Sequence, residues 1–282
     1  MDLGLRPTDR VLVFGASGWF GRELRALLAR SEITSKVLWV PGPSSRAGPS
    51  ETEIAEFQAS VVVNFAALTR ERVAIDGEAP FMRTNELLTR RFHQHAEASG
   101  VRLAVTVSSG AAVTEPDHPY GRMKAAEEKS ALELAESGRS VVVMRAYSVS
   151  GGYVRRPRDY AFSDFIIQAA SGEIRVSAAS AVFRRYCSVQ DALFVALQQG
   201  ADGRSGLFET GGEYVEMGGL AAAIVSSVNP QAVVTRPTFQ NEAPTSYCSD
   251  NSSWSEWSLD AGLRPADLQE QISQAAAVLS AS

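Results

Sequence analysis

Short apolar runs alternate with amphipathic stretches along the first half of the chain. Val11–Phe14 is an apolar run closed by Gly15, and Leu24, Leu27 and Leu28 then recur at helical spacing opposite charged residues. The first pattern is typical of a strand buried on both faces of a parallel sheet, and the second of an amphipathic helix. Further strands are predicted at 37–40, 61–65, 103–107 and 141–144, and further helices at 51–59, 84–99 and 120–137. This alternation predicts an α/β fold with a doubly wound parallel sheet.

Composition and charge narrow the class of protein. The chain has 282 residues, of which 45% are hydrophobic and 21% charged, as in a soluble globular protein. The net charge of -5, without a run of Lys or Arg, argues against a nucleic-acid partner. No stretch approaches the roughly 20 apolar residues of a membrane span, and the charged residues of the first ten positions lead us to expect no signal peptide there. With Cys187 and Cys248 as the only cysteines, we expect a cytoplasmic protein with a small-molecule partner.

A glycine-rich turn joins the first predicted strand to the first predicted helix. Its glycines, Gly15, Gly18 and Gly21, are spaced three apart. Glycines at such a turn bring backbone N–H groups against a pyrophosphate at the helix N-terminus. The alternative is an ordinary glycine-rich turn between a strand and a helix, which can have the same sequence pattern. The residues of the turn predicted to bind a dinucleotide are Gly15, Ser17, Gly18, Trp19, Phe20 and Gly21.

A tyrosine and a lysine four residues apart begin the helix predicted at 120–137. The spacing puts Tyr120 and Lys124 on one helical face, one turn apart. An ammonium beside a phenol favours the phenolate, so such a pair can move a proton. An isolated pair of this kind is also common as surface decoration. Its position, after a strand that ends in Ser108 and Ser109, favours the chemical interpretation.

Together the two motifs resemble those of the extended short-chain dehydrogenases/reductases, the epimerases and dehydratases that modify nucleotide sugars. Gly-Ala-Ser-Gly-x-x-Gly and Tyr-Gly-x-x-Lys both match, and Arg145–Gly151 and Arg185–Asp191 are similar to further blocks of that family. The resemblance implies a Rossmann-type sheet, NADP or NAD as cofactor and a nucleotide sugar as substrate. It also implies a homodimer formed through the helix that carries Tyr120 and Lys124.

The resemblance also implies roles for single residues. Ala66 and Ala67 follow the strand that passes beneath the adenosine, and Tyr147 belongs to the loop over the nicotinamide. Lys124 holds the nicotinamide ribose. Arg185 binds the substrate diphosphate, for which a planar guanidinium is suited. The alternative is that Ser188 and Asp191 form a helix cap and that Arg185 is a solvated charge.

The catalytic hydroxyl is less directly placed by the resemblance. An ungapped register on Val113 puts Gly110 at that position, and a shift of one residue restores Ser109. We expect Ser109, with Ser108 as the alternative, because a hydroxyl beside the reacting oxygen is chemically useful. The predicted catalytic residues are therefore Ser109, Tyr120 and Lys124.

The cofactor preference rests on a departure from the family pattern. NAD enzymes place an acidic residue about 20 positions beyond the glycines, and this chain has none there. Ser44, Ser45 and Arg46 follow the second strand instead and suit a 2′-phosphate, which favours NADP slightly. The stretch 41–60 is also too short for the family's usual additional strand.

The rhythm of strands and helices becomes irregular beyond Gly151. We therefore predict a dinucleotide-binding domain formed by 1–151 with about 185–210. The predicted substrate-binding region is smaller, mostly carboxy-terminal, and formed by 152–184 and 211–282. His93, His95 and His118 lack the spacing of a metal site, and Trp254 and Trp257 are expected to pack a carboxy-terminal helix.

The residues after Ser109 narrow the reaction. Gly110, Ala111 and Ala112 cannot move a proton, so elimination of water is disfavoured. Tyr120, Lys124 and Ser109 suit hydride transfer to or from a carbonyl, as in a 4-ketoreductase or a 4-epimerase of a nucleotide hexose. The alternatives are a reductase of another small carbonyl compound and a non-catalytic NAD(P)-binding regulator.

Overall fold

The computed structural model describes residues 2–31, 36–43, 48–240 and 242–281, and these form two units. The first comprises Met1–Ala146 with Leu193–Glu209, and the second Tyr147–Ala192 with Thr210–Ser282. The predicted division by role, into a dinucleotide domain and a substrate region, stays a prediction. No helix in the described ranges is long and apolar enough to cross a membrane.

The first unit is built on a six-stranded sheet in the order β2-β1-β3-β4-β5-β9, and every neighbouring pair is parallel. The doubly wound parallel sheet predicted from the apolar runs is confirmed, and it is of the Rossmann type that the family resemblance implies. The strands are β1 (Arg10–Phe14), β2 (Lys36–Val40), β3 (Val61–Asn64), β4 (Leu103–Ser109), β5 (Ser140–Ala146) and β9 (Gly206–Glu209).

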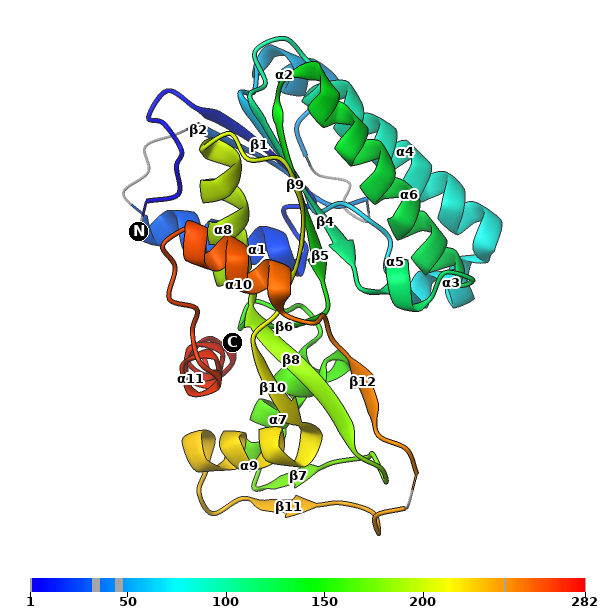
Figure 1. Cartoon of the computed structure of the whole chain (residues 1–282), viewed down its shortest axis with the longest axis vertical. Coiled ribbons are helices and arrows are strands. Elements are labelled where there is room, and N and C mark those ends of the chain that lie inside the picture. Colours follow the sequence, from blue (N-terminus) through cyan, green and yellow to red (C-terminus); the bar gives the residue numbers. More distant parts are fainter. Residues whose placement is uncertain (1, 32–35, 44–47, 241, 282) are drawn as a thin grey trace. The chain divides into compact units, whose positions relative to one another are not determined.

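Helices cover both faces of this sheet (Figure 1). The helices are α1 (Trp19–Arg30), α2 (Glu51–Glu56), α3 (Glu71–Asp76), α4 (Glu78–Ala96), α5 (Ala111–Thr114), α6 (Pro119–Glu133), the 3-10 helix η1 (Leu134–Ser137) and α8 (Val189–Ala201). In Figure 1, α4 and α6 lie on one face and α1 and α8 on the other. Ile54 of α2, Phe92 of α4 and Ala131 of α6 pack on strand residues in one buried cluster, so these helices form a shared core layer.

The direction of winding changes at β1. The chain adds β2 on one side of β1 and then returns to add β3 on the other. In open parallel sheets such a switch point opens a crevice at the carboxyl ends of the strands, where ligands bind. Between β2 and β3 the described residues hold α2 and no strand, as the short 41–60 stretch predicted.

Local chemistry explains where α4 and α6 begin. The first was predicted from Thr84 and begins earlier, after Gly77 at φ 81°. The second begins at Pro119, and its N-cap His118 accepts a hydrogen bond at Nδ1 from the backbone N–H of Tyr120 at 3.1 Å. Proline suits a first helical position because the N–H that it lacks would have no partner there.

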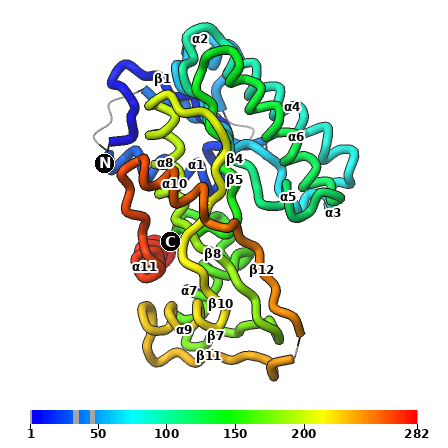
Figure 2. Tube along the Cα trace, in the orientation of Figure 1, coloured from blue at the N-terminus to red at the C-terminus, as the bar shows by residue number. Residues whose placement is uncertain are grey.

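The second unit is organised around β8, which runs antiparallel to β10 and parallel to β6 and β12. Figures 1 and 2 show α7 and α9 beside the parallel pair β7 and β11. Trp254 and Trp257 are 3% and 4% exposed, so packing of a carboxy-terminal helix is their role. The elements are β6 (Ser148–Ser150), η2 (Pro157–Asp159), α7 (Ala161–Ala170), β7 (Glu173–Arg175), β8 (Val182–Ser188), β10 (Glu213–Glu216), α9 (Met217–Val228), β11 (Val233–Thr235), β12 (Thr245–Tyr247), α10 (Ser252–Asp260) and α11 (Leu268–Leu279).

Candidate functional site

Two of the three motif glycines are required by the fold itself. Gly15 has φ 77°, and a Cβ built on it would lie 2.5 Å from the carbonyl carbon of Phe65. A Cβ on Gly21 would lie 2.6 Å from the Cα of Ala16. These glycines let the turn pass close to β3 and let α1 begin close to the turn.

Gly18 differs from both. It caps α1 in an extended conformation, with φ -76° and ψ 177°. Among the described residues, a Cβ built on it would meet only the carbonyl oxygen of Gly15 within 4 Å, at 3.2 Å. Gly18 thus has one close contact, with the carbonyl of its own turn, and a glycine turn of this kind at a helix N-terminus fits a pyrophosphate.

The remaining residues of the turn tie it to neighbouring elements. The Oγ of Ser17 accepts a hydrogen bond from the N–H of Gly42, beyond β2, at 3.0 Å. The Nε1 of Trp19 donates to Glu23 at 3.0 Å, and the ring of Phe20 lies 5.9 Å from that of Phe65. The turn is thereby held against the segments that follow β2 and β3.

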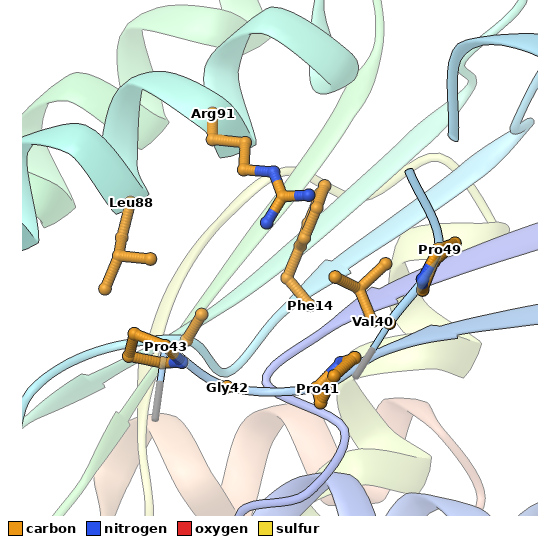
Figure 3. Close-up of a pocket in the computed structure, with 10 residues that line it drawn as sticks. Phe14, Val40, Pro41, Gly42, Pro43, Pro49, Leu88 and Arg91 are labelled. Atoms are coloured by element: carbon orange, nitrogen blue, oxygen red, sulfur yellow. The ribbon is translucent and has the colours of Figure 1, made fainter. Parts of the chain in front are cut away.

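A cavity of about 380 Å³ lies where β1, β2 and β3 end (Figure 3). It contains the predicted cofactor residue Ala66. The guanidinium of Arg91 enters from α4, and its carbon lies 5.0 Å from the centre of the Phe14 ring. Arg46, with Ser44 and Ser45, lies outside the described residues. The lining residues are Phe14, Val40, Pro41, Gly42, Pro43, Gly48, Pro49, Ala66, Leu88 and Arg91.

Lys124 is buried and already paired. Its Nζ donates to Glu127 Oε2 at 2.8 Å and to the carbonyl oxygen of Val107 at 3.2 Å, and the residue is 5% exposed. Burial lowers the pKa of Lys124, but the charges of Glu127 and Tyr120 and the hydrogen bond to Glu127 outweigh it, so the pKa is raised. The side chain is therefore an ammonium, anchored to β4 by the Val107 carbonyl and one helical turn from Tyr120.

Gly121 explains part of the Tyr-Gly-x-x-Lys pattern. A Cβ at this position would overlap the carbonyl oxygen of Glu115 and come within 2.6 Å of that of Ala111. Only glycine lets α5 and the segment after it pack this closely on α6. The contact holds the turn that contains Tyr120 beside the residues that follow β4.

The two serines at the end of β4 have different surroundings. Ser108 is 4% exposed, and its Oγ has no hydrogen-bond partner among the described residues. Ser109 is half-buried, and its Oγ accepts from the N–H of Ala111 at 3.3 Å. Adjacent strand residues point to opposite faces of the sheet, so the two hydroxyls lie in different surroundings.

A largely buried ion-pair group, which the sequence interpretation missed, lies beside Ser108, whose register partner on β5 is Arg145. Arg145 at the end of β5 donates to both carboxylate oxygens of Glu128 at 2.7 and 2.6 Å and to Glu209 at 2.6 Å. The hydrogen bond to Glu128 is the largest contribution that raises the pKa of Arg145. The group joins α6, β5 and β9, so the helix that bears Tyr120 is fixed on the sheet.

Tyr147 and Arg185 belong to the second unit. The N–H of Tyr147 donates to Thr210 Oγ1 at 2.9 Å, and its ring lies 5.1 Å from that of Tyr247. The guanidinium carbon of Arg185 lies 5.0 Å from the Tyr214 ring centre, and Nη1 donates to Gly212 O at 3.1 Å. Arg185 is therefore half-buried and stacked, which is not the environment of a solvated charge.

Ser188 caps the start of α8, which is one half of the capping box weighed as an alternative. The N–H of Asp191 donates to Ser188 Oγ at 3.4 Å. The Asp191 carboxylate accepts from the N–H of Ala266 at 2.8 Å. The cap accounts for Ser188 and Asp191 but leaves Arg185 unexplained. Within the described ranges, no group of three or more His, Cys, Asp or Glu side chains is placed to hold a metal ion.

Comparisons with known proteins found relatives in sequence and in fold. A curated dTDP-4-dehydrorhamnose reductase from Streptomyces griseus is 33% identical over 159 residues, which are 51% of this chain and 52% of that protein. This chain thus spans about half the length of the curated relative that it matches.

Solved structures share the fold across nearly the whole chain. RMD from Pseudomonas aeruginosa complexed with NADPH has a TM-score of 0.76 at 19% identity, with 97% of this chain and 99% of that one covered. A GDP-L-fucose synthetase from Naegleria fowleri has a TM-score of 0.80 at 13% identity, with 98% and 94% covered. The UDP-glucose 4-epimerase of Thermus thermophilus, in complex with NAD, has 0.72 at 20% identity, with 96% and 99% covered.

A family model matches the segment that contains both motifs and most of the six-stranded sheet. The model is described as the NAD dependent epimerase/dehydratase family and covers residues 11–207. The match confirms the resemblance drawn from the motifs and, with it, the expected class of NAD(P)-dependent enzyme. The chain belongs to the NAD dependent epimerase/dehydratase family.

Proposed function

We propose that this chain is an NAD(P)-dependent ketoreductase that acts on the 4-keto group of a nucleotide-linked hexose. The observation that carries the proposal is the Tyr120–Lys124 face of α6, anchored to β4 in the unit that also contains the open glycine turn. A cofactor-binding regulator would not need a buried, paired ammonium beside a tyrosine.

Each residue of this face has a part in the chemistry. A reduced nicotinamide supplies the hydride that adds to the carbonyl carbon when the cofactor is bound. Tyr120 donates its phenolic proton to the carbonyl oxygen, and Ser109 holds that oxygen by a hydrogen bond. Lys124, held by Glu127 and the Val107 carbonyl, keeps a positive charge near Tyr120 and binds the nicotinamide ribose.

Surroundings support Ser109 over Ser108 in this role. Ser108 is 4% exposed, whereas Ser109 is half-buried and has an accessible side. Gly110, Ala111 and Ala112 add no acid or base, so the proposal does not include elimination of water. The remaining proposed cofactor contacts are Gly15, Ser17, Gly18, Trp19, Phe20, Gly21, Ala66, Ala67 and Tyr147.

The nucleotide-sugar part of the proposal draws on relatives and on Arg185. The names of the similar reductase, synthetase and epimerase all refer to nucleotides or nucleotide sugars. Arg185 donates one hydrogen bond through Nη1 to Gly212 O, and the other terminal N–H groups of its guanidinium leave donor capacity for a diphosphate.

Turnover assays with purified protein test the proposal. With NADPH and a dTDP-4-keto-6-deoxyhexose, we expect one cofactor oxidised for each 4-hydroxy sugar formed, and almost none with Tyr120→Phe. Interconversion of plain nucleotide hexoses without net cofactor oxidation would instead identify a 4-epimerase. Tight cofactor binding with no turnover of nucleotide sugars would favour another small carbonyl substrate or a regulator.

A homodimer is part of the same proposal. The outer side of α4 and α6 has an open groove lined by Thr89, Arg90, His93, Gln94, Glu97 and Ser130. The family resemblance pairs two copies through the helix that carries Tyr120 and Lys124. We expect a dimer mass by light scattering at micromolar concentration, and a monomer mass would contradict this part.

A further inference from the structure

We propose that Arg91 selects the cofactor by binding the 2′-phosphate of NADP(H). The inference rests on the proposed function only in that a nicotinamide dinucleotide binds at the glycine turn. It assigns to a residue of α4 a role that no motif of the sequence indicated.

The position of the cavity identifies which part of a dinucleotide would occupy it. Phe14 and Val40 end β1 and β2, and Ala66 lies just beyond β3, so the cavity adjoins the switch point of the sheet. In sheets of this type the adenosine ribose lies beside the end of the second strand. Figure 3 shows Arg91 extending from α4 into the same space, with Pro41 and Pro43 across from it.

The charges around the cavity favour a phosphate over a free hydroxyl. A carboxylate after the second strand reads the ribose 2′-hydroxyl of NAD, whereas a nearby arginine accommodates the 2′-phosphate of NADP. Among the described residues that line the cavity, none is acidic and Arg91 is the one cation. A guanidinium donates two parallel hydrogen bonds to a phosphate, which a lysine does not.

Arg91 is oriented but retains donor capacity. Its Nη2 pairs with Glu51 Oε1 at 2.6 Å, and its guanidinium lies over the Phe14 ring. The Glu51 side chain is 67% exposed, so this ion pair is weak and a phosphate can compete with it. The Nε of Arg91 is buried and has no hydrogen-bond partner in the described part of the chain. A guanidinium has five N–H donors, so terminal N–H groups remain for a phosphate beside the pair with Glu51.

The test compares cofactors with and without the 2′-phosphate by isothermal calorimetry. The ligands are NADPH against NADH, and adenosine 2′,5′-bisphosphate against AMP. The variants are Arg91→Ala, Arg91→Lys and, as matched control, Arg83→Ala, which removes an exposed arginine of the same helix. We expect Arg91→Ala to weaken NADPH and the bisphosphate by about tenfold or more, with NADH and AMP changed less than about twofold. Arg91→Lys should restore part of the loss, and Arg83→Ala should change nothing.

The outcomes separate this inference from the proposed function. Equal losses for NADPH and NADH in Arg91→Ala, unchanged binding of both, or tighter binding of NADH by the unmodified chain would each overturn the role of Arg91 and leave the reductase proposal standing. Failure of the unmodified chain to bind either cofactor would refute the proposed function itself. Glu51→Gln offers a second check, because loss of the competing carboxylate should tighten NADPH severalfold without affecting NADH.

Discussion

The sheet of the first unit ends in two regions with contrasting electrostatics. Where β1 and β2 end, the cavity is lined by proline, glycine and apolar residues, with one guanidinium in a solvent-exposed ion pair. Where β4 and β5 end, Lys124 is paired with Glu127, and Arg145 with Glu128 and Glu209, in largely buried contacts.

The difference indicates that the first region is suited to binding a ligand and the second to holding catalytic groups in a fixed orientation. A cation in a weak ion pair can bind an arriving phosphate with little loss of free energy, so the first region can distinguish ligands with that phosphate from ligands without it. Buried charges that are already paired do not reorganise, so the second region fixes groups that act on a reacting centre. Changes in the first region should therefore alter affinity, and changes in the second should alter turnover or stability.

Tyr120→Phe should have the largest effect. Removal of the phenolic proton donor is expected to lower turnover by about 10² to 10⁴. Cofactor affinity should change little, because the glycine turn is untouched. Stopped-flow turnover and calorimetric binding on one preparation measure both. A loss of cofactor affinity as large as the loss of turnover would contradict the distinction between the two regions.

Gly18→Val should mainly affect cofactor affinity. The new side chain would occupy the open side of the turn where a pyrophosphate approaches, so cofactor binding should fall by about 100-fold or more. Urea unfolding should show a modest loss of about 1 kcal/mol, because the new Cβ would lie 3.2 Å from the carbonyl oxygen of Gly15 at the N-cap of α1. Gly15→Ala is the contrasting control: its positive φ and its proximity to Phe65 predict a loss of about 1–3 kcal/mol in unfolding free energy. A Gly18→Val protein that binds normally would refute the assignment.

Ser109→Ala should lower turnover by about 10- to 100-fold with an unchanged cofactor affinity. Ser108→Ala should leave turnover within about twofold, because that hydroxyl is buried without a partner among the described residues and its loss removes no hydrogen bond to them. The reverse ranking would assign the catalytic hydroxyl to Ser108.

Glu127→Gln should act on stability, with a loss of about 1–3 kcal/mol in unfolding free energy, because Lys124 keeps its hydrogen bond to the Val107 carbonyl and gains a neutral amide in place of the carboxylate. The folded-state pKa of Lys124 is raised, so the stabilisation from its pair is complete below the unfolded value of 10.5 and is lost as the pH rises through the folded value. The difference in unfolding free energy between the unmodified chain and Glu127→Gln should thus be constant from pH 6 to pH 9, well below 10.5. It should decrease at higher pH. A difference that disappears near neutral pH would contradict the pairing.

The elements that sequence predicted well are those whose burial is visible in the residues themselves. The parallel strands of the first unit are buried on both faces, so β3 reads as an uninterrupted run of valines, Val61–Val63. The glycine turn could also be predicted from sequence, because the positive φ at Gly15 and the close packing at Gly21 require glycine. The start of α4 was missed because its first turn, with Pro80, reads as loop.

The parts that sequence did not predict depend on distant partners. Glu127 lies three residues from Lys124, a spacing that joins residues on one helix face and was a usable signal. Arg91 has no such signal, since its partners Phe14 and Glu51 lie on other elements far along the chain. In the second unit β8 pairs with short strands from three separate segments, and no local pattern specifies that register.

The missing outer strand leaves β2 as the edge of the parallel sheet among the described residues. Edge strands present unpaired backbone groups on which another chain can add by β-augmentation, and natural proteins keep such edges short, charged or interrupted by proline. β2 has five residues, begins with the exposed Lys36 and is followed by Pro41, and Arg25 covers the ring of its Trp39 at 4.2 Å. Val40 and Pro41 also line the cavity, so a bound dinucleotide would shield one end of this strand. Self-association should therefore be slower with cofactor present, which makes ligand occupancy a determinant of the solubility of the chain as well as of its chemistry.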